Sequence, residues 1–431
     1  MPAEWVNWIA DAATTLSNAK SFKDVWGLAQ IALNLNGAQP LGHILAGVVL
    51  RSDSDFEQAE LAFRRALALD PQNSIAMANL GAVIYDKNPA EALELLRAAM
   101  DKDPSSDFIA QTYMLAVMSS GDWERGWNLY NRRTRFPAVG NQICRYPDRI
   151  DGHAGRWDGI TGKVNKRSAQ VLLVGEEGIG ERIMFASMVE DVMKTGATPL
   201  IEVTSGFERF SPWFRRSFPK LKICQGGESH AIDYHINIGD LGAMFRRKES
   251  DFPKHKGYMT WDKKRAAHFR HRLSPGPVIG LSYKSLANAG PYKSIPLKDL
   301  WPILRIPGAT FVDLQYQGTE QERNAHAPLL NHLPDLDLVN DMDGVAALIG
   351  ACDLVITVSS VAAHMAGAMG KKCWTFIPSR AGRMWFWGTR GEKSPWYPSM
   401  KLYRQELSAD WKPSIERMAA DLETFVRDYR S

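Results

Sequence analysis

Small and apolar residues in the first third of the chain recur in a frame of about 34 residues. The first unit starts at Pro40, and its small, apolar and proline positions are Ala46, Gly47, Leu50, Ala59, Phe63, Ala66 and Pro71. A second unit repeats this order with one residue fewer between its helices, and a weaker third unit includes Gly126 and Tyr130. Small residues at matching positions let two helices approach closely, and a proline ends each pair. The pattern of residues 40–133 therefore predicts helical hairpins stacked in series.

This period and residue order are those of the tetratricopeptide repeat. Ordinary amphipathic helices without a repeat are the alternative for the first two units. Upstream, Trp5, Trp8, Ile9 and Ala12 recur at helical spacing. We expect residues 2–35 to form two more helices of the same layer, without a clear repeat.

The pattern changes after residue 165, where short apolar runs alternate with helical segments. The intervening residues 134–165 are rich in Gly, Pro and Arg without periodicity, which is typical of a connector. Strands are predicted at 169–174, 199–203, 221–224, 234–238, 278–283, 310–315, 336–339, 354–359 and 373–377. Helices are predicted at 183–195, 297–305, 319–330, 344–351 and 361–369. Such alternation predicts two doubly wound parallel sheets with a ligand cleft between them.

Composition narrows the class of protein. A chain of 431 residues is too long for one core, so several domains are expected. A net charge of +4 gives no reason to expect a nucleic acid partner. The longest early apolar run, 44–50, is too short to cross a bilayer, and the N-terminus lacks a basic leader, so a cytoplasmic protein without a membrane span is expected. The four cysteines are far apart, which favours reduced thiols without metal.

The first predicted sheet carries a glycine-rich turn between a strand and a helix. Gly175, Gly178 and Gly180 follow the order GxxGxG and not the dinucleotide order GxGxxG, so a nicotinamide cofactor is not expected. Glu181 begins the following helix and could take a proton from an acceptor hydroxyl. The alternative is an acidic residue that only complements the helix dipole.

The second predicted sheet carries candidates for anion binding. Ser359 and Ser360 precede helix 361–369, whose first backbone N–H groups could hold a phosphate. The alternative is an ordinary serine N-cap. Lys284 and Lys293 flank a Gly-Pro loop and could reach the same pocket, although lysines on loops are usually solvated.

Two further features have competing explanations. His364 lies one turn into helix 361–369, where a histidine is more often a core residue than a catalyst. The aromatic residues of 384–387 and 396–397 need a cover, which either a ligand or the packing of the two sheets would supply. Motifs of P-loop, serine hydrolase, zinc protease and paired CxxC type are absent, and the Asp-x-Asp matches are too short to indicate a metal-dependent transferase.

Together these features resemble a family of bacterial proteins in which tetratricopeptide repeats precede a glycosyltransferase of the GT-B fold. The resemblance is to ADP-heptose heptosyltransferases and, more distantly, to O-GlcNAc transferase. It covers most of the chain beyond the first 40 residues. The motifs that carry it are GDWERGWNLYNRR, LLVGEEGIGERIMFA, KSIPLKDL, FVDLQYQG, ACDLVITVSSVAAHMAGAMGKKCWTFIP and SPWYPSMKLYRQ.

The resemblance implies a role for each matching residue. Glu181 corresponds to the general base. The residues implied in donor binding are Lys284, Lys293, Gln315, Ser359, Ser360, Val361 and His364. The residues implied in the acceptor-side loop are Gly178, Gly180 and Asp240. Glu181 replaces an Asp of the family, Ser359 replaces an acid, and Ser282–Lys284 replaces a Trp-containing strand end.

The expected fold is α plus α/β, with helical tetratricopeptide repeats followed by two Rossmann-like doubly wound sheets. The expected domains are a repeat domain at 1–135, an acceptor-side domain at 136–274 and a nucleotide-sugar domain with a closing helix at 275–431. The expected activity is metal-independent, inverting transfer from a nucleotide sugar, without another cofactor. The acceptor would be a protein, such as a surface or flagellar subunit, or a glycan held by the repeats. The alternative, motivated by the altered motif residues, is an inactive scaffold for protein interaction.

Overall fold

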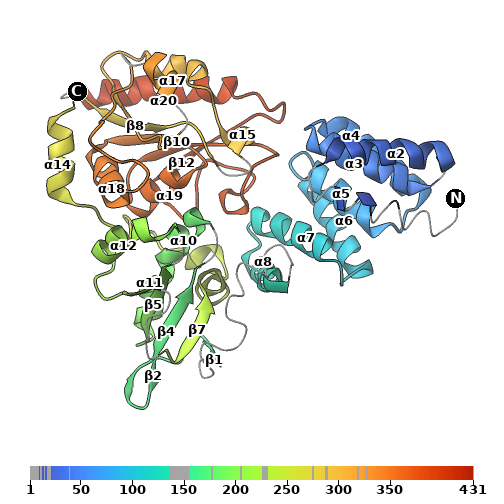
Figure 1. Ribbon diagram of the computed structural model, residues 1–431, viewed down its shortest axis with the longest axis horizontal. Coiled ribbons are helices and arrows are strands. Elements are labelled where there is room, and N and C mark those ends of the chain that lie inside the picture. The colour runs from blue at the N-terminus through green and yellow to red at the C-terminus, as the bar shows by residue number, and fades with distance from the viewer. Residues whose placement is uncertain are drawn as a thin grey trace. The chain divides into compact units, whose positions relative to one another are not determined.

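The computed structural model describes most of the chain in two compact units, Met1–Arg133 and Thr134–Ser431 (Figure 1). The described ranges are 21–37, 39–135, 155–175, 178–203, 206–225, 232–273, 276–286, 290–317, 320–325 and 329–430, with five single residues between 9 and 16. Trp5 and Trp8 of the predicted first helix and most of the predicted connector, at 136–154, lie outside these ranges.

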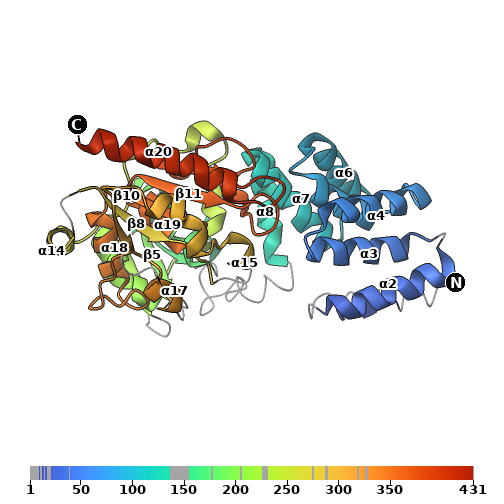
Figure 2. The same cartoon turned by 90° about the horizontal axis from the view of Figure 1, so that it is seen from above.

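The first unit consists of helices that pack in sequence order, as the repeat pattern predicts. They are α2 (Phe22–Asn36), α3 (Pro40–Ser52), α4 (Phe56–Leu69), α5 (Ser74–Ile84), α6 (Pro89–Lys102), α7 (Asp107–Ser120), α8 (Trp123–Tyr130) and the 3-10 turn η1 (Asn131–Arg135). From α2 to α8, each helix packs against the one that follows it in sequence (Figure 2). In addition, α5 packs against α7. In α4 to α8 a polar side chain at the N-cap accepts a backbone N–H of the first turn, which fixes where each helix begins.

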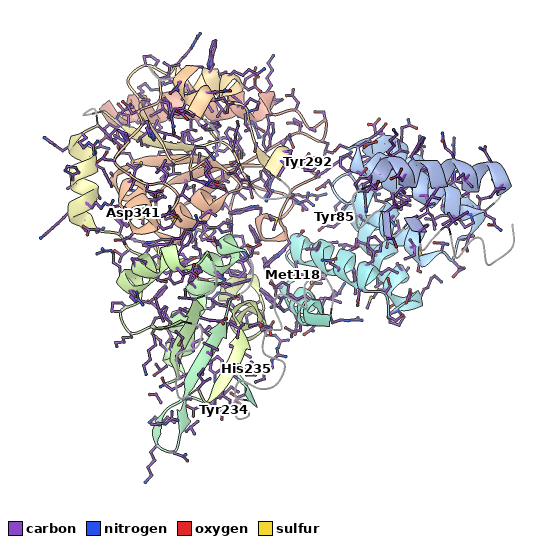
Figure 3. The ribbon with its side chains drawn as sticks, in the orientation of Figure 1. Tyr85, Met118, Tyr234, His235, Tyr292 and Asp341 are labelled. Atoms are coloured by element: carbon purple, nitrogen blue, oxygen red, sulfur yellow. The ribbon has the colours of Figure 1, made fainter. Side chains whose placement is uncertain are left out.

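Glycines set the spacing within the helical hairpins. A Cβ on Gly47 would lie 2.6 Å from the ring of Phe63, and one on Gly81 would lie 2.7 Å from Leu96. A side chain at either position would force the two helices of a hairpin apart. Between hairpins, the Tyr85 hydroxyl donates to the carbonyl of Ala116 at 2.6 Å (Tyr85 is labelled in Figure 3).

The described residues of the second unit form two parallel sheets of five strands each. The first sheet has the order β1-β7-β4-β5-β6 and includes Tyr234 and His235, which Figure 3 labels on β7. Its strands are β1 (Gly155–Arg156), β4 (Gln170–Val174), β5 (Thr198–Val203), β6 (Lys222–Gln225) and β7 (Tyr234–Asn237), and β2 (Lys163–Val164) with β3 (Arg167–Ser168) forms a separate antiparallel hairpin. Its helices and 3-10 turns are α10 (Ile179–Phe185), η2 (Ala186–Met188), α11 (Val189–Lys194), η3 (Glu208–Phe210), α12 (Ser211–Ser217), η4 (Ile238–Leu241), α13 (Gly242–Phe245) and η5 (Glu249–Asp251).

The second sheet has the order β12-β11-β10-β8-β9. Its strands are β8 (Val278–Ser282), β9 (Thr310–Asp313), β10 (Leu354–Val358), β11 (Cys373–Ile377) and β12 (Met400–Arg404). Its helices and 3-10 turns are α15 (Gly290–Lys293), η6 (Leu297–Leu300), α16 (Trp301–Leu304), α17 (Glu320–Ala325), α18 (Met342–Ala351), α19 (Val361–Ala368), η7 (Trp385–Trp387) and α20 (Lys412–Arg430). The strands β4, β8, β10 and β11 are almost wholly buried, which explains their continuous apolar runs. The long helix α20 covers one face of this sheet (Figure 2).

The chain passes from the first sheet to the second through α14 (Lys263–His271), which packs against α18. Arg216 on α12 binds Asp343 on α18 with two contacts, at 2.9 and 2.8 Å. Asp341, labelled in Figure 3, caps the N-terminus of α18 through the N–H of Gly344 and pairs with Arg265 on α14. These contacts join the two sheets into one compact unit.

The predicted fold class is confirmed, with errors in individual elements. The strand predicted at 336–339 is wrong, because the Asp337 carboxylate accepts the N–H groups of Val339 and Asn340 and so forms a turn. The helix predicted at 319–330 is wrong at its end, because Leu329 and Leu330 lie in a turn and a bend before Asn331 pairs with β9. The described part of α17 is Glu320–Ala325. The helix predicted at 183–195 begins at Ile179 instead and is divided into α10, η2 and α11. The edge strands β1 and β12 were not predicted.

Substituting Gly81 with Val tests the close approach of α5 and α6. The new side chain meets Leu96 and the carbonyl of Ala92, and overpacking of this kind costs about 1 to 3 kcal/mol. Hydrogen exchange of the α5 and α6 amides in the full chain should accelerate accordingly. Gly27 on α2 has no atom within 4 Å of its Cβ position, so Gly27→Val should change stability by less than about 0.5 kcal/mol. Equal effects of the two substitutions would show that helix spacing is not what Gly81 controls.

Candidate functional site

The candidate site lies where α10 of the first sheet meets α19 of the second. Each helix begins at the carboxyl edge of its sheet, α10 after β4 and α19 after β10. A Cβ on Gly180 would lie only 2.7 Å from Cδ2 of His364, so the first turns of the two helices touch through a glycine. The fold thus brings together predicted residues that are more than 180 positions apart in the sequence.

Glu181 lies in the first turn of α10, whose N-cap is Gly178. Its carboxylate folds back over that glycine, because a Cβ on Gly178 would lie 1.7 Å from Oε2 of Glu181. An acidic side chain here interacts favourably with the helix dipole, as the alternative interpretation holds. The same position is partly open to solvent and faces Lys293 of the second sheet, so the structure is compatible with both interpretations.

Lys293 ends the short helix α15 and is only 6% exposed. Burial lowers the pKa of its ammonium group, and the nearby charge of Glu181 partly opposes this shift. Its amine forms no hydrogen bond with any residue in the described part of the chain. A buried cation of this kind is a suitable partner for an anionic ligand.

Lys284 and Gln315 have partners within the second sheet. Lys284 forms an ion pair with Glu322 on α17. Gln315 is 1% exposed, and its Oε1 accepts the hydroxyl of Ser282 at 3.2 Å and the backbone N–H of Lys284 at 2.9 Å. Both residues therefore shape the carboxyl end of β8. Their assignment to donor binding stays a prediction.

Ser359 and Ser360 differ in what their hydroxyls do. Ser360 is the N-cap of α19, but its side chain makes no capping bond and lies 3.1 Å from the hydroxyl of Thr357. The ordinary N-cap explanation is therefore not supported, and the first N–H groups of α19, starting at Val361, are left uncapped by this side chain. The Ser359 hydroxyl is buried and accepts the indole N–H of Trp387 at 2.9 Å.

His364 is 4% exposed within an aromatic cage. The rings of Phe386, Trp387 and Tyr397 have centroids 5.1 to 5.7 Å from its imidazole. Its Nδ1 is 2.8 Å from the Tyr397 hydroxyl. Burial, helped by the charge of Lys293, lowers the pKa of His364 to about 3, so the imidazole is neutral near neutral pH.

The aromatic run joins the two sheets. Its members Trp385, Phe386, Trp387, Trp396 and Tyr397 are all at most 6% exposed. Phe185, the last residue of α10, contacts Trp385 and Trp396 at ring distances of 6.5 and 5.8 Å. Of the two explanations from the sequence, the packing of the sheets is the one the structure shows.

Asp240 follows β7 at the carboxyl edge of the first sheet and is 3% exposed. Its carboxylate pairs with Arg156 of β1 at 2.9 Å. Arg156 was not identified from the sequence, because it lies in the predicted connector, where no periodicity marks a strand. Tyr258, which contacts α10 through its hydroxyl, was also missed, since a single tyrosine in a linker carries no pattern.

The described residues hold neither a cluster of metal ligands nor a helix that could span a membrane. No three His, Cys, Asp or Glu side chains among them gather closely enough to hold a metal ion. None of the helices formed by these residues combines the length and apolarity needed to cross a bilayer.

Comparison with known proteins gives one relative in sequence and several similar folds. No protein-family model matches the chain. The chain is 30% identical to the protein FlbA of Caulobacter vibrioides over 425 residues, covering 90% of this chain and 68% of FlbA.

Three solved structures of bacterial glycosyltransferases are similar to the chain. A family 9 glycosyl transferase of Veillonella parvula is 10% identical, covering 60% of this chain and 98% of its own, with a TM-score of 0.44. ADP-heptose heptosyltransferase II of E. coli is 12% identical, covering 61% and 100%, with a TM-score of 0.44. The O-GlcNAc transferase of Thermobaculum terrenum is 13% identical, covering 99% and 93%, with a TM-score of 0.34.

The lowered pKa of His364 predicts acid sensitivity. The folded pKa is about 3, below the ordinary value of about 6.5 that applies to the unfolded chain. As the pH falls below about 6.5, His364 is protonated in the unfolded chain but stays neutral in the folded chain. The free energy of unfolding therefore falls by up to about 1.4 kcal/mol per pH unit. Urea denaturation between about pH 4 and pH 7 should show a steeper loss for the wild type than for His364→Gln. Equal slopes would mean that the folded state protonates His364 normally.

Proposed function

The chain belongs to the FlbA family, and we propose that it is a metal-independent glycosyltransferase that moves a sugar from a nucleotide-sugar donor to a protein or glycan acceptor. The observation that carries the proposal is the meeting of α10 and α19. Near this junction, Glu181 of the first sheet is within electrostatic range of the buried ammonium of Lys293, and Lys293 is within electrostatic range of His364 on α19, whose start the Ser360 side chain leaves uncapped. A carboxylate and an anion-binding helix start are the groups that sugar transfer from a diphosphate needs.

The donor diphosphate would bind at the start of α19. Backbone N–H groups of the first turn point along the helix axis, and the helix dipole adds a partial positive charge there. Lys293 supplies a full positive charge whose burial strengthens its attraction for a phosphate. These groups would stabilise the charge that builds on the departing diphosphate, a task that other transferases give to a metal ion.

Glu181 would act on the acceptor. Its carboxylate takes the proton of the acceptor hydroxyl while the hydroxyl oxygen attacks the anomeric carbon of the sugar, and the bond to the diphosphate breaks on the opposite side. This single displacement inverts the configuration of the anomeric carbon. The acceptor would approach along the glycine turn of the first sheet, where the Glu181 carboxylate lies over Gly178.

The acceptor is proposed to be a protein, such as a surface or flagellar subunit, or a glycan. Helical hairpins in series form extended surfaces that commonly bind peptide segments. The hairpins of the first unit supply such a surface on the same chain as the transfer site.

A screen of donors tests the proposal as a whole. The thermal stability of the full chain is measured with ADP, UDP, GDP and CMP sugars, and any stabilising donor is then tested for hydrolysis or transfer. Binding of a ligand to the folded state raises the melting temperature, and the rise grows with the logarithm of the ligand concentration once this exceeds the dissociation constant. No stabilisation by any nucleotide or nucleotide sugar would refute a transferase function.

An inactive scaffold is the second candidate, because several predicted ligands already have partners. Lys284 is paired with Glu322, and the Ser359 hydroxyl is held by Trp387. In this alternative the sheets persist as a rigid support while the repeats bind a partner protein. A nucleotide bound at Ser360 in crystals soaked with donor would count against it, and transfer of a sugar would exclude it.

Glu181→Gln distinguishes between two roles for Glu181, that of a catalytic base and that of an acidic residue that only stabilises the start of α10. The amide keeps the size of the side chain but cannot accept the proton, so transfer should fall by roughly 10²- to 10⁴-fold. Donor affinity should barely change, because the donor sits on the other sheet. If Glu181 only complements the helix dipole, the substitution should lower the free energy of unfolding by about 0.3 to 1 kcal/mol and leave turnover nearly intact.

Lys293→Met tests the cation of the donor site. Methionine keeps the apolar length of the side chain but removes the charge, and loss of a charge-assisted contact to phosphate should weaken nucleoside diphosphate binding by roughly 10- to 100-fold. Titration calorimetry measures this directly. Lys298→Met, which changes an exposed lysine of the same sheet, is the matched control and should bind normally. Unchanged affinity in Lys293→Met would remove Lys293 from the site.

A further inference from the structure

Arg404, the last residue of β12, binds the segment 387–391 that follows the aromatic turn η7. Its guanidinium donates to four main-chain carbonyls of that segment. The bonds are Nε to Gly391 at 2.8 Å, Nη1 to Gly388 at 3.1 Å, and Nη2 to Trp387 and Arg390 at 2.7 and 3.0 Å. One side chain thus fixes the path of the main chain over the whole segment.

Two glycines let the carbonyls of this segment face one point. Gly388 has a φ of 61° and a ψ of -172°, a conformation that is open to glycine and strained for any residue with a side chain. Gly391 has a φ of 74°, which also favours glycine. The order Gly-x-x-Gly at 388–391 therefore provides the turn that the bonds of Arg404 require.

The charge of Arg404 is met by these carbonyl dipoles. No carboxylate of the described residues forms an ion pair with it, and the nearest charge that affects it is the cation of Arg383. Burial, helped by Arg383, lowers the pKa of Arg404 to about 10, so the guanidinium stays charged near neutral pH. A largely buried cation is costly unless it is well hydrogen-bonded, and the planar fork of arginine meets this need where the single ammonium of a lysine does not.

Trp387 links Arg404 to the candidate site. Its carbonyl accepts from Arg404, and its indole N–H donates to the hydroxyl of Ser359 at 2.9 Å. Its ring centroid lies 5.2 Å from that of His364 on α19. Ser359 directly precedes the N-cap of α19, and His364 lies one turn into the helix. Trp387 therefore contacts the chain before and after the first N–H groups of α19.

We propose that Arg404 is a positioning residue of the donor site, which holds Trp387 against Ser359 and so sets the place of the first N–H groups of α19. It acts through Trp387 and not by contact with the donor. The fork of donors is needed as well as the charge, so lysine cannot replace it. The identity of the ligand as a nucleoside diphosphate rests on the proposed function, whereas the placement of Trp387 rests on the hydrogen bonds alone.

The indole N–H of Trp387 reports this placement directly. The full chain is labelled with ¹⁵N-tryptophan, and the indole signal that disappears in Trp387→Phe belongs to Trp387. In the wild type this proton should exchange slowly with solvent, because it is buried and bonded to Ser359. In Arg404→Lys, which keeps the charge and loses the fork, the signal should shift and its exchange should accelerate by about tenfold. An unchanged signal would overturn the proposal.

Arg270→Lys is the matched control. Arg270 also donates to two main-chain carbonyls, those of Ala351 and Gly276, at 3.2 and 3.1 Å, and it pairs with Asp353 at 2.6 Å. These groups lie at the amino end of β10, whereas α19 follows its carboxyl end. The control should leave the Trp387 signal unchanged. A shift as large as that in Arg404→Lys would show general loosening of the fold and overturn the specific role of Arg404.

Gly388→Ala disturbs the same bonds from the side of the segment and serves if Arg404→Lys does not fold. The added Cβ is strained at the observed φ, so the carbonyls at 387 and 388 should turn away from Arg404. The indole signal of Trp387 should then shift as in Arg404→Lys. A folded Gly388→Ala protein with an unchanged signal would equally overturn the proposal.

Calorimetry with ADP, UDP and GDP tests whether the placement matters for the donor site. For a diphosphate that the wild type binds, Arg404→Lys should weaken binding by roughly 10-fold, about the loss of one charge-assisted hydrogen bond. Arg270→Lys should stay within about twofold of the wild type. Unchanged affinity in Arg404→Lys would remove Arg404 from the donor site.

The double variant Arg404→Lys/Trp387→Phe shows whether Arg404 acts through Trp387. Residues that act in one chain are not additive, so the double variant should bind no more weakly than the weaker single variant. Additive losses would overturn the link between the two residues. If the wild type binds no nucleotide at all, the proposed function fails and the donor part of this proposal with it, while the indole signal still decides whether Arg404 places Trp387.

Discussion

Most of the candidate site depends on Gly180 of α10 lying directly against His364 of α19. The absence of a side chain at residue 180 allows this contact, since a Cβ there would approach the imidazole to 2.7 Å. With the helices this close, Glu181 comes within electrostatic range of Lys293, and the aromatic run of the second sheet reaches Phe185 at the end of α10. A larger residue at position 180 would separate all of these groups at once.

Burial at this junction determines the charge states of the polar groups. Moving a charged group out of water is costly, so His364 is neutral near neutral pH and the ammonium of Lys293 loses its proton more readily than a solvated lysine. The pairs that cross between the sheets outside the junction are more exposed and contribute less, such as Arg216 with Asp343. The aromatic contacts and the close helix packing therefore hold the sheets together more than the ion pairs do.

The structure separates the residues predicted for the site into two groups. Lys284, Gln315 and Ser359 have partners that shape the carboxyl end of the second sheet. Lys293 makes no hydrogen bond within the described residues, and the Ser360 side chain does not cap the start of α19. This distinction favours a site built from few side chains and from backbone groups.

The sequence by itself determined the helical repeats, the two parallel sheets and the helices on which Glu181 and His364 lie, because these depend on local periodicity and on buried apolar runs. It failed where a local pattern was overruled, as at 336–339, where Asp337 caps a turn, and at β1 and β12, which are strands through pairing with a neighbour. Only the tertiary structure decided that the aromatic run packs the sheets together and that Tyr258 reaches both α10 and α19. Such contacts join residues far apart in the chain, and their geometry comes from how the sheets pack, which no spacing of residues along the sequence records.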